Sequence, residues 1–157
     1  VKEHRYRGMG TTCVACLVDE KNLYVAHVGD SRCYLMRDGA IEQVTEDHSL
    51  VNEQIQAGLI TKEEAVNHKS KNVITRSLGY NKEVEVDVQV LPLQVGDSVL
   101  LCSDGLCNLV QAEEMLQKVT TPHASLQNVC RQLVNQACER GGDDNITVVL
   151  FSVHNED

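Results

Sequence analysis

Three aspartates are the residues in this sequence with the clearest capacity for chemistry. Asp30, Asp104 and Asp144 each stand where an apolar, strand-like run begins or ends, a place near the surface but held by a rigid scaffold. Carboxylates brought together repel one another unless a cation holds them. Oxygen ligands without a nearby histidine or thiolate cluster favour Mg²⁺, Mn²⁺ or Ca²⁺ over Zn²⁺. The three aspartates therefore suggest a divalent-cation site, although a single aspartate in such a place is usually a turn residue or a helix cap.

The cysteines and histidines carry weaker signals. The seven cysteines are odd in number and lie mostly in apolar runs, which predicts buried free thiols in a reducing cytoplasm. Cys13 and Cys16 match C-x-x-C, but strand alternation sends them to opposite faces, so we expect no shared zinc ion or disulfide. We expect His27 to be a packing residue and His48 to brace the segment that follows it, whereas His68 lies in a polar stretch that could approach a substrate.

The first 45 residues predict an antiparallel sheet built from short hairpins. Polar residues separate the first two strand-like runs, and Asp38-Gly39, a preferred tight hairpin turn, separates the third from the fourth. The predicted strands are Thr11–Val18, Asn22–Val28, Arg32–Arg37 and Ala40–Thr45.

Residues 49–72 interrupt this strand pattern. Ser49 can cap a short helix over Leu50–Ala57 that Gly58 ends. The stretch Thr61-Lys62-Glu63-Glu64 is a capping box that opens a second short helix. We interpret residues 49–72 as an excursion from the sheet.

The rest of the chain returns to strands and adds two longer helices. The helix predicted over His123–Arg140 has one apolar face, with Pro122 placed for its first turn and Gly141 at its end. Antiparallel strands with separate helices indicate an α+β layered fold in a single domain, residues 1–157. The other predicted elements are strands Val73–Thr75, Val84–Val90, Ser98–Cys102 and Asn145–Val153 and helix Gln111–Val119.

Charge and hydropathy exclude two classes of partner. The net charge is −9 and the pI is about 5.1, which argues against a nucleic-acid surface because such a surface needs clustered Lys and Arg. No apolar run reaches about 18 residues, so we expect no membrane span. With no recognisable signal peptide, we expect a cytoplasmic protein.

Six short motifs occur in order along nearly the whole chain, and together they are more specific than any one alone. The series resembles the protein phosphatase 2C-like (PPM) family of metal-dependent serine/threonine phosphatases, especially its short bacterial members. This resemblance implies a four-layer α-β-β-α sandwich of antiparallel sheets flanked by helices, incomplete in this chain. The motifs are Gly8-Met9-Gly10-Thr11-Thr12, Val28-Gly29-Asp30-Ser31-Arg32, Asp47-His48-Ser49, Thr75-Arg76-Ser77-Leu78-Gly79, Leu101-Cys102-Ser103-Asp104-Gly105-Leu106 and Gly141-Gly142-Asp143-Asp144-Asn145-Ile146-Thr147.

The resemblance also implies a metal-activated water as the nucleophile, and no covalent catalytic residue. Two bridging Mn²⁺ or Mg²⁺ ions would hold the water that attacks a phosphoserine or phosphothreonine phosphorus in a protein. By position, Asp104 and Asp144 match ligands of the first core metal, and Asp30 matches a ligand, with Asp104, of a third, more weakly held ion. Asn145 would support Asp144 without binding the metal itself.

The substrate side of the site is expected near residues 49–72, which resemble the family's flap. Arg76 and His68 could contact a phosphorylated partner there. The expected partners are phosphoserine and phosphothreonine proteins, including a serine/threonine kinase.

One part of the family pattern is absent from this sequence. The family's N-terminal part should supply an acidic ligand on an early strand and an Asp-Gly segment that bridges both metals, and neither precedes Gly8. The chain is then a fragment of an active enzyme, which we favour, a naturally truncated non-catalytic regulatory or interaction domain, or one part of a site that another chain completes. We expect little activity from the isolated chain and, because sheet edges are left open, possible self-association.

Overall fold

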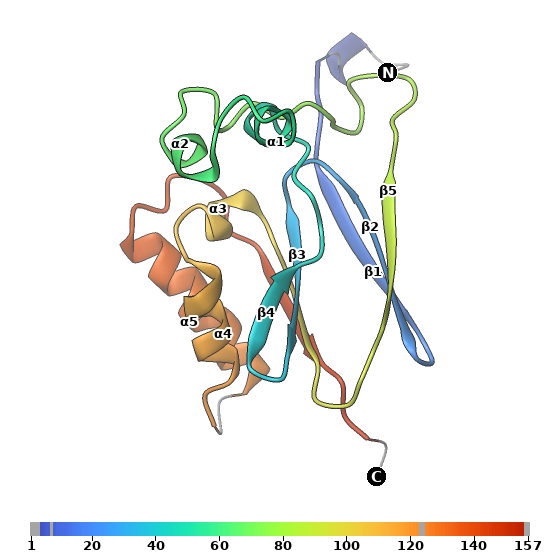
Figure 1. The fold of residues 1–157 in the computed structure, drawn as a ribbon, viewed down its shortest axis with the longest axis vertical. Helices are drawn as coiled ribbons and strands as arrows, with labels where there is room; N and C mark the ends of the chain where they lie inside the picture. The colour runs from blue at the N-terminus through green and yellow to red at the C-terminus, as the bar shows by residue number, and fades with distance from the viewer. Residues whose placement is uncertain (1–3, 7, 123–124, 156–157) are drawn as a thin grey trace.

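Two antiparallel sheets stacked face to face form the centre of the molecule (Figure 1). The computed structural model describes residues 4–6, 8–122 and 125–155. The first sheet has three strands in the order β1-β2-β5, and the second has four in the order β4-β3-β6-β7. The strands are β1 Cys13–Asp19, β2 Asn22–Val28, β3 Arg32–Arg37, β4 Ala40–Gln43, β5 Asp87–Pro92, β6 Ser98–Cys102 and β7 Val148–Ser152.

The predicted hairpins are confirmed, because β1 pairs with β2 and β3 pairs with β4, both antiparallel. Asp38 and Gly39 form the tight turn of the second hairpin, between the paired residues Arg37 and Ala40. Side chains that alternate along the strands meet between the two sheets and form one core cluster. Its buried members are Leu23, Val25, Cys33, Leu35, Val44, Val99 and Leu101.

A layer of helices covers the outer face of the four-stranded sheet (Figure 1). The longest helix, α5 Leu126–Glu139, buries Val129, Leu133 and Ala137 completely, so the predicted amphipathic helix is confirmed. These three side chains of α5 pack with Tyr34, Met36, Leu100 and Cys102 in the second core cluster. The other helices of this layer are α3 Asp104–Cys107 and α4 Ala112–Val119.

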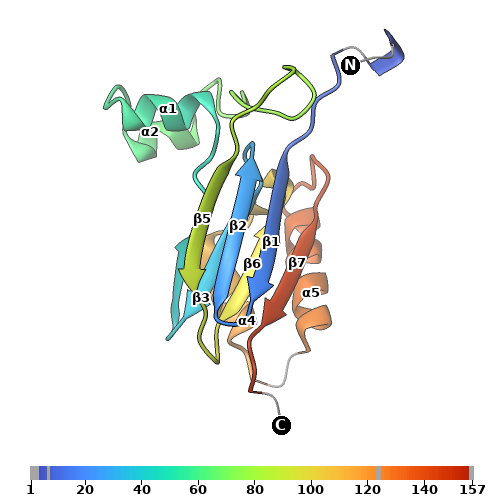
Figure 2. The same ribbon diagram turned by 90° about the vertical axis from the view of Figure 1, so that its right-hand side faces the viewer.

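Residues 49–72 leave the sheets at one end of the molecule and carry two short helices (Figure 2). In α1 Leu50–Gln56 the Ser49 hydroxyl caps the helix by accepting a hydrogen bond from the Asn52 N–H. In α2 Lys62–Val66 the predicted Thr61–Glu64 capping box is present. A one-turn 3₁₀ helix, His4–Tyr6, lies near the N-terminus.

The outer face of the three-stranded sheet has no helix over it in the described ranges (Figure 2). The predicted α+β architecture of two antiparallel sheets with helices is therefore confirmed, but the described chain supplies three of the four expected layers. In residues 4–6, 8–122 and 125–155, no helix is both long and apolar enough to cross a membrane.

Several predicted boundaries are wrong. Val73–Thr75 forms only an isolated bridge, between Ile74 and Ser49, because its pairing stops at the two flanking backbone hydrogen bonds to Leu50 and His48. The strand predicted over Val84–Val90 starts at Asp87 and runs to Pro92, because its register is set by pairing with β2. The last strand begins at Val148, three residues later than predicted.

Two helix predictions also need correction. Helix α5 begins at Leu126 with Ser125 as its N-cap, so Pro122 precedes the helix and does not occupy its first turn. The residue His123, where the helix was predicted to begin, lies outside the described residues. The one-turn helix α3 was not predicted, because four residues are too few to show a helical period.

Candidate metal centre

Strand pairing brings the three aspartates to the same end of the four-stranded sheet. Arg32 at the start of β3 pairs with Cys102 at the end of β6, and Cys102 also pairs with Val148 at the start of β7. Asp30 precedes β3, Asp104 follows β6 and Asp144 precedes β7. The three loops therefore lie at the same end of three neighbouring strands, so the segments that carry the carboxylates are near one another.

The loop that carries Asp30 is held against Thr12, the residue before β1. Gly29 has φ +108°, and a Cβ added there would lie 2.3 Å from the Thr12 Cγ2 atom, so only glycine fits. The hydroxyls of Thr12 and Ser31 share a hydrogen bond of 2.9 Å on the other side of Asp30. These contacts fix the direction in which the chain passes the half-buried Asp30.

The loops of Asp104 and Asp144 are held together through their backbones. The Ser103 hydroxyl donates to the Asn145 carbonyl (2.8 Å) and accepts from the Thr147 N–H (3.0 Å). Gly105 lies so close to this loop that an added Cβ would sit 2.5 Å from the Asn145 carbonyl oxygen. The two loops thus form one unit at the end of β6 and β7.

Electrostatics links Asp30 to Asp104. Burial raises the pKa of the Asp30 carboxyl above its ordinary value, and the negative charges of Asp104 and then Asp47 raise it further. The Asp104 carboxylate accepts the Gly105 N–H at 2.9 Å, a bond that orients it. A carboxylate such as Asp30, whose ionisation is disfavoured by burial and by a neighbouring negative charge, belongs to a donor set that a divalent cation would stabilise.

Asp144 is the most exposed of the three predicted ligands. Its carboxylate accepts the backbone N–H of Asn145 at 2.7 Å. Asn145 thus contacts Asp144 through its backbone, while its carbonyl accepts the Ser103 hydroxyl. Its support of a metal ligand stays a prediction.

Sequence reasoning missed an ion pair beside this group. Arg32 donates from Nε and Nη2 to the two oxygens of Asp47, at 2.9 and 2.7 Å. Burial alone would lower the pKa of the Arg32 guanidinium, but the hydrogen bonds to Asp47 raise it. Asp47 belongs to one of the six ordered motifs, which was the available signal. The pair fixes Asp47 near Asp30, and the guanidinium of Arg32 is engaged by Asp47.

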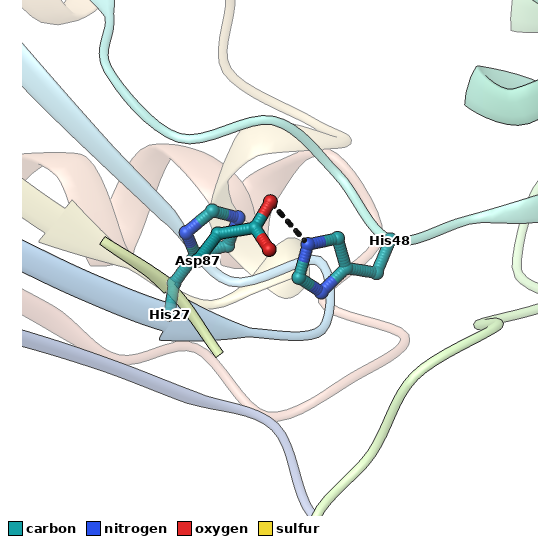
Figure 3. A group of neighbouring side chains, drawn as sticks. All are labelled: His27, His48 and Asp87. Carbon is teal, nitrogen blue, oxygen red and sulfur yellow. Dashed lines mark hydrogen bonds and ion pairs between the residues drawn. The ribbon is translucent and has the colours of Figure 1, made fainter. Parts of the chain in front are cut away.

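A second network, of His27, His48 and Asp87, lies beneath the Gly29 turn, and its possible ligand atoms all fall within 4.8 Å of one another (Figure 3). His48 Nδ1 accepts the Gly29 N–H at 3.1 Å, so Nε2 carries the proton and donates to Asp87 at 3.1 Å. His27 stacks on His48 with ring centroids 4.6 Å apart and donates from Nε2 to the Glu46 carbonyl.

These hydrogen bonds decide what the histidine network does. Both nitrogens of His48 are used by protein partners, so His48 has no lone pair left for a metal unless one of these bonds breaks. The network therefore supports the Gly29–Asp30 turn. The buried His27 ring packs there as expected, whereas the His48 ring contacts this turn and not the following segment that it was predicted to brace. Asp87, the third member, was missed because it lies 39 positions from His48.

The two predicted substrate residues, Arg76 and His68, contact residues other than the three predicted metal ligands. Arg76 Nη1 binds the Asp87 carboxylate at 2.7 Å and lies 4.0 Å from Glu85. Burial acts to raise the pKa of Asp87, but hydrogen bonds from His48 and Arg76 lower it below its ordinary value. His68 follows α2, is half-buried and accepts the Ser70 N–H at Nδ1. The contact of either residue with a substrate stays a prediction.

The fold and its carboxylates define a two-sheet α+β protein with acidic loops gathered at one end of the stacked sheets. Residues 2–146 match the family described as Protein phosphatase 2C, so this chain belongs to that family.

Curated bacterial proteins share substantial identity with the chain. It is 46% identical over 143 residues to the serine/threonine phosphatase stp of Listeria monocytogenes, covering 91% of this chain and 56% of that protein. It is 44% identical over 157 residues to the protein phosphatase PhpP of Streptococcus pneumoniae, covering 99% of this chain and 63% of that protein. The chain thus spans 56–63% of the length of these relatives.

Solved structures share the fold closely. The serine/threonine phosphatase of S. agalactiae superposes with a TM-score of 0.92 at 42% identity, over 98% of this chain and 63% of that one. PstP/Ppp of Mycobacterium tuberculosis superposes with a TM-score of 0.90 at 38% identity, over 95% and 62%. A PstP catalytic domain in complex with two manganese ions superposes with a TM-score of 0.84.

Proposed function

We propose that this chain is part of a metal-dependent protein phosphatase that hydrolyses phosphoserine and phosphothreonine in proteins. The observation that carries the proposal is the strand pairing that brings the loops of Asp30, Asp104 and Asp144 to one end of a phosphatase 2C fold. The relatives named above are serine/threonine phosphatases, and this chain spans 56–63% of their length. The activity is therefore proposed for a whole protein that contains these residues.

The residues present fit a divalent cation, because burial and the negative charge of Asp104 disfavour ionisation of Asp30. Asp104 and Asp144 would hold one Mn²⁺ or Mg²⁺ ion, and Asp30 with Asp104 another. When bound, such ions activate a water for attack and neutralise phosphate charge. The Gly105 and Asn145 N–H groups stabilise and orient the Asp104 and Asp144 carboxylates.

On the substrate side, residues 49–72 would act as a flap beside the carboxylates. His68 within it and Arg76 after it are the proposed contacts to a phosphorylated protein, and a serine/threonine kinase is among the proposed partners. The Asp87 ion pair already occupies Arg76, so it would have to exchange partners on binding phosphate. We place the protein in the cytoplasm, which suits its reduced cysteines in the described ranges.

Manganese binding tests the aspartate assignment. Titration calorimetry of the 157-residue chain with MnCl₂ should give binding that weakens at least about tenfold in Asp104→Asn and in Asp30→Asn. Asp143→Asn is the matched control, because it removes an exposed carboxylate beside Asp144 that has no assigned role. Binding by Asp104→Asn as strong as by the wild type would contradict the assignment.

Phosphatase assays then test the activity. The intact gene product should dephosphorylate a phosphothreonine peptide with Mn²⁺, and EDTA or Asp104→Asn should abolish turnover. We expect little turnover from the 157 residues alone, since they span only 56–63% of the relatives' length. An intact product that binds Mn²⁺ without hydrolysing the peptide would favour a non-catalytic regulatory or interaction domain.

A further inference from the structure

Two cysteines from different sheets meet in the core between the sheets. Cys16 lies on β1 of the three-stranded sheet and Cys33 on β3 of the four-stranded sheet, with 3.7 Å between their sulfur atoms. Cys16 packs against the core cluster that contains Cys33. The partner of Cys16 is therefore a residue 17 positions away across the sandwich, and not Cys13 of the same C-x-x-C motif.

The two thiols are unequal in exposure and in chemistry. Cys16 is half-buried, whereas Cys33 is fully buried. The hydrogen bond from the Cys33 thiol lowers the pKa of Cys16, and burial opposes this effect more weakly. The same hydrogen bond, and then burial, raises the pKa of Cys33. Cys16 is thus the more accessible and more readily ionised sulfur, and Cys33 is a neighbour in contact with it.

We propose that Cys16 and Cys33 are an oxidisable pair that forms a disulfide between the two sheets when the protein meets a peroxide. In the first step the Cys16 sulfur attacks one peroxide oxygen, the O–O bond breaks, and sulfenic acid and water (from hydrogen peroxide) form. In the second step the Cys33 sulfur attacks the Cys16 sulfur, the S–O bond breaks, and the sulfenic oxygen leaves as water. Two thiols are oxidised by two electrons in total, and one peroxide is reduced.

The other cysteines explain why this pair is singled out. Cys13 is exposed and faces outward on the same strand, away from the inter-sheet core. Cys102 and Cys107 interact with each other, but both are buried. Cys130 and Cys138 lie on α5, eight positions apart along one helix. Within the described ranges, only Cys16 and Cys33 combine a partly buried cysteine with a thiol partner in contact across two elements.

The disulfide would act on the end of the molecule that carries Asp30. Cys33 is the second residue of β3 and follows Asp30 by three positions, and Thr12, the residue before β1, already contacts this turn through its hydrogen bond to Ser31. A bond between β1 and β3 would tie the two sheets covalently beside this turn. Because the link closes a loop of the chain, it should stabilise the folded state relative to the unfolded one.

Peptide mapping of the peroxide-treated 157-residue chain tests the proposal. Dilute protein is treated with hydrogen peroxide, free thiols are alkylated, and the protein is digested with trypsin without reduction. We expect two of the seven thiols to become unreactive and residues 8–21 to be linked to residues 33–37. The thermal midpoint should rise on oxidation and return after treatment with dithiothreitol.

Three variants make the assignment specific. Cys13→Ser is the matched control, since it removes the second cysteine of fragment 8–21 and should leave the cross-link unchanged. Cys16→Ser and Cys33→Ala should abolish the link. A link through Cys13, links only between two chains, or overoxidised Cys16 without any link would each overturn the proposal. Because the wild type and Cys13→Ser already decide among these outcomes, a Cys33→Ala variant that fails to fold would not obscure the result.

Discussion

At the scale of single residues, close backbone approach determines how the acidic loops are arranged. Gly29 passes Thr12 and Gly105 passes Asn145 at distances that leave no room for a side chain. Gly105 lies within the short helix α3 and has no positive φ, so conformation alone does not require glycine there. Space is the reason for Gly105, and the space is taken by the loop that carries Asp144.

Replacing Gly105 by alanine therefore separates two effects of opposite sign. Helical propensity favours alanine over glycine by about 1 kcal/mol. A Cβ placed 2.5 Å from the Asn145 carbonyl oxygen would force the two loops apart. We expect Gly105→Ala to lose about 1–3 kcal/mol of unfolding free energy, as overpacking does. Urea denaturation measures it, and Asn108→Ala, an exposed position at the end of α3, is the control. A more stable Gly105→Ala would show that these loops are not in contact.

The sequence allowed the position of the three aspartates next to strand ends to be predicted, because local patterns indicate those strands; their role as metal ligands stays a prediction. It did not allow their partners to be predicted. Asp87 binds His48 from 39 positions away, and Asp47 binds Arg32 from 15. Such pairs depend on which strands become neighbours, and local patterns do not encode strand order.

At the scale of elements, an ion pair between a partly exposed arginine and a buried aspartate joins the end of β3 to the start of β6. Asp97 is 1% exposed in the turn that leads into β6, and its carboxylate accepts two hydrogen bonds from Arg37, at 2.8 and 2.7 Å. It also accepts the Gln94 N–H at 2.7 Å. The Arg37 hydrogen bonds are the main reason that the pKa of Asp97 lies below its ordinary value, although burial opposes them.

This pair should make stability depend on pH in a defined direction. A carboxyl whose pKa is lowered by folding stabilises the protein above its unfolded pKa, and the stabilisation is lost as pH falls through the folded pKa. We expect Asp97→Asn to be less stable than the wild type at pH 7 by about 1–3 kcal/mol. The difference should shrink below about pH 4, the ordinary aspartate pKa.

Urea denaturation at pH 7 and at acidic pH measures this difference. Asp38→Asn is the control, because Asp38 is exposed in the adjacent hairpin turn and asparagine tolerates its positive φ of 50°. It should show no such pH-dependent difference from the wild type. A constant difference between Asp97→Asn and the wild type at all pH values would contradict an ionised Asp97 as the source of the stabilisation.

Elements with a strong local pattern were predicted well, and elements set by pairing were not. Helix α5 follows from its apolar face and strand β3 from its run between two turns, and both occur as predicted within a few residues. Strand β5 is displaced because its apolar run begins at Val84, whereas pairing with β2 begins only at Asp87, opposite His27. Tertiary pairing decides such boundaries.

At the scale of the whole molecule, the two sheets differ in what covers them. Antiparallel sheets that face water on one side usually carry polar side chains there. The outer face of the three-stranded sheet instead carries two cross-strand rows of mostly apolar residues. The rows are Ala15–Ala26–Val88 and Leu17–Tyr24–Val90, with Leu17, Val88 and Val90 exposed by 65%, 61% and 53%.

This face predicts how the isolated 157-residue chain behaves in solution. Exposed contiguous apolar surface binds apolar dyes and promotes association. The net charge of −9 opposes association between copies, and salt screens that repulsion. We therefore expect the chain to bind the dye ANS and to self-associate more strongly as salt is raised, which sedimentation velocity would detect.

Paired substitutions on β5 locate the effect on this face. Val88→Thr with Val90→Thr keeps β-branched side chains while adding hydroxyls, so dye binding and association should fall with little change in the thermal midpoint. Val95→Thr is the control, because Val95 is 60% exposed but lies in the turn before β6. If the paired variant and Val95→Thr reduce dye binding equally, this sheet face is not the site. A monomer that binds no dye at any salt concentration would mean that the apolar rows are covered in solution by a part of this same chain.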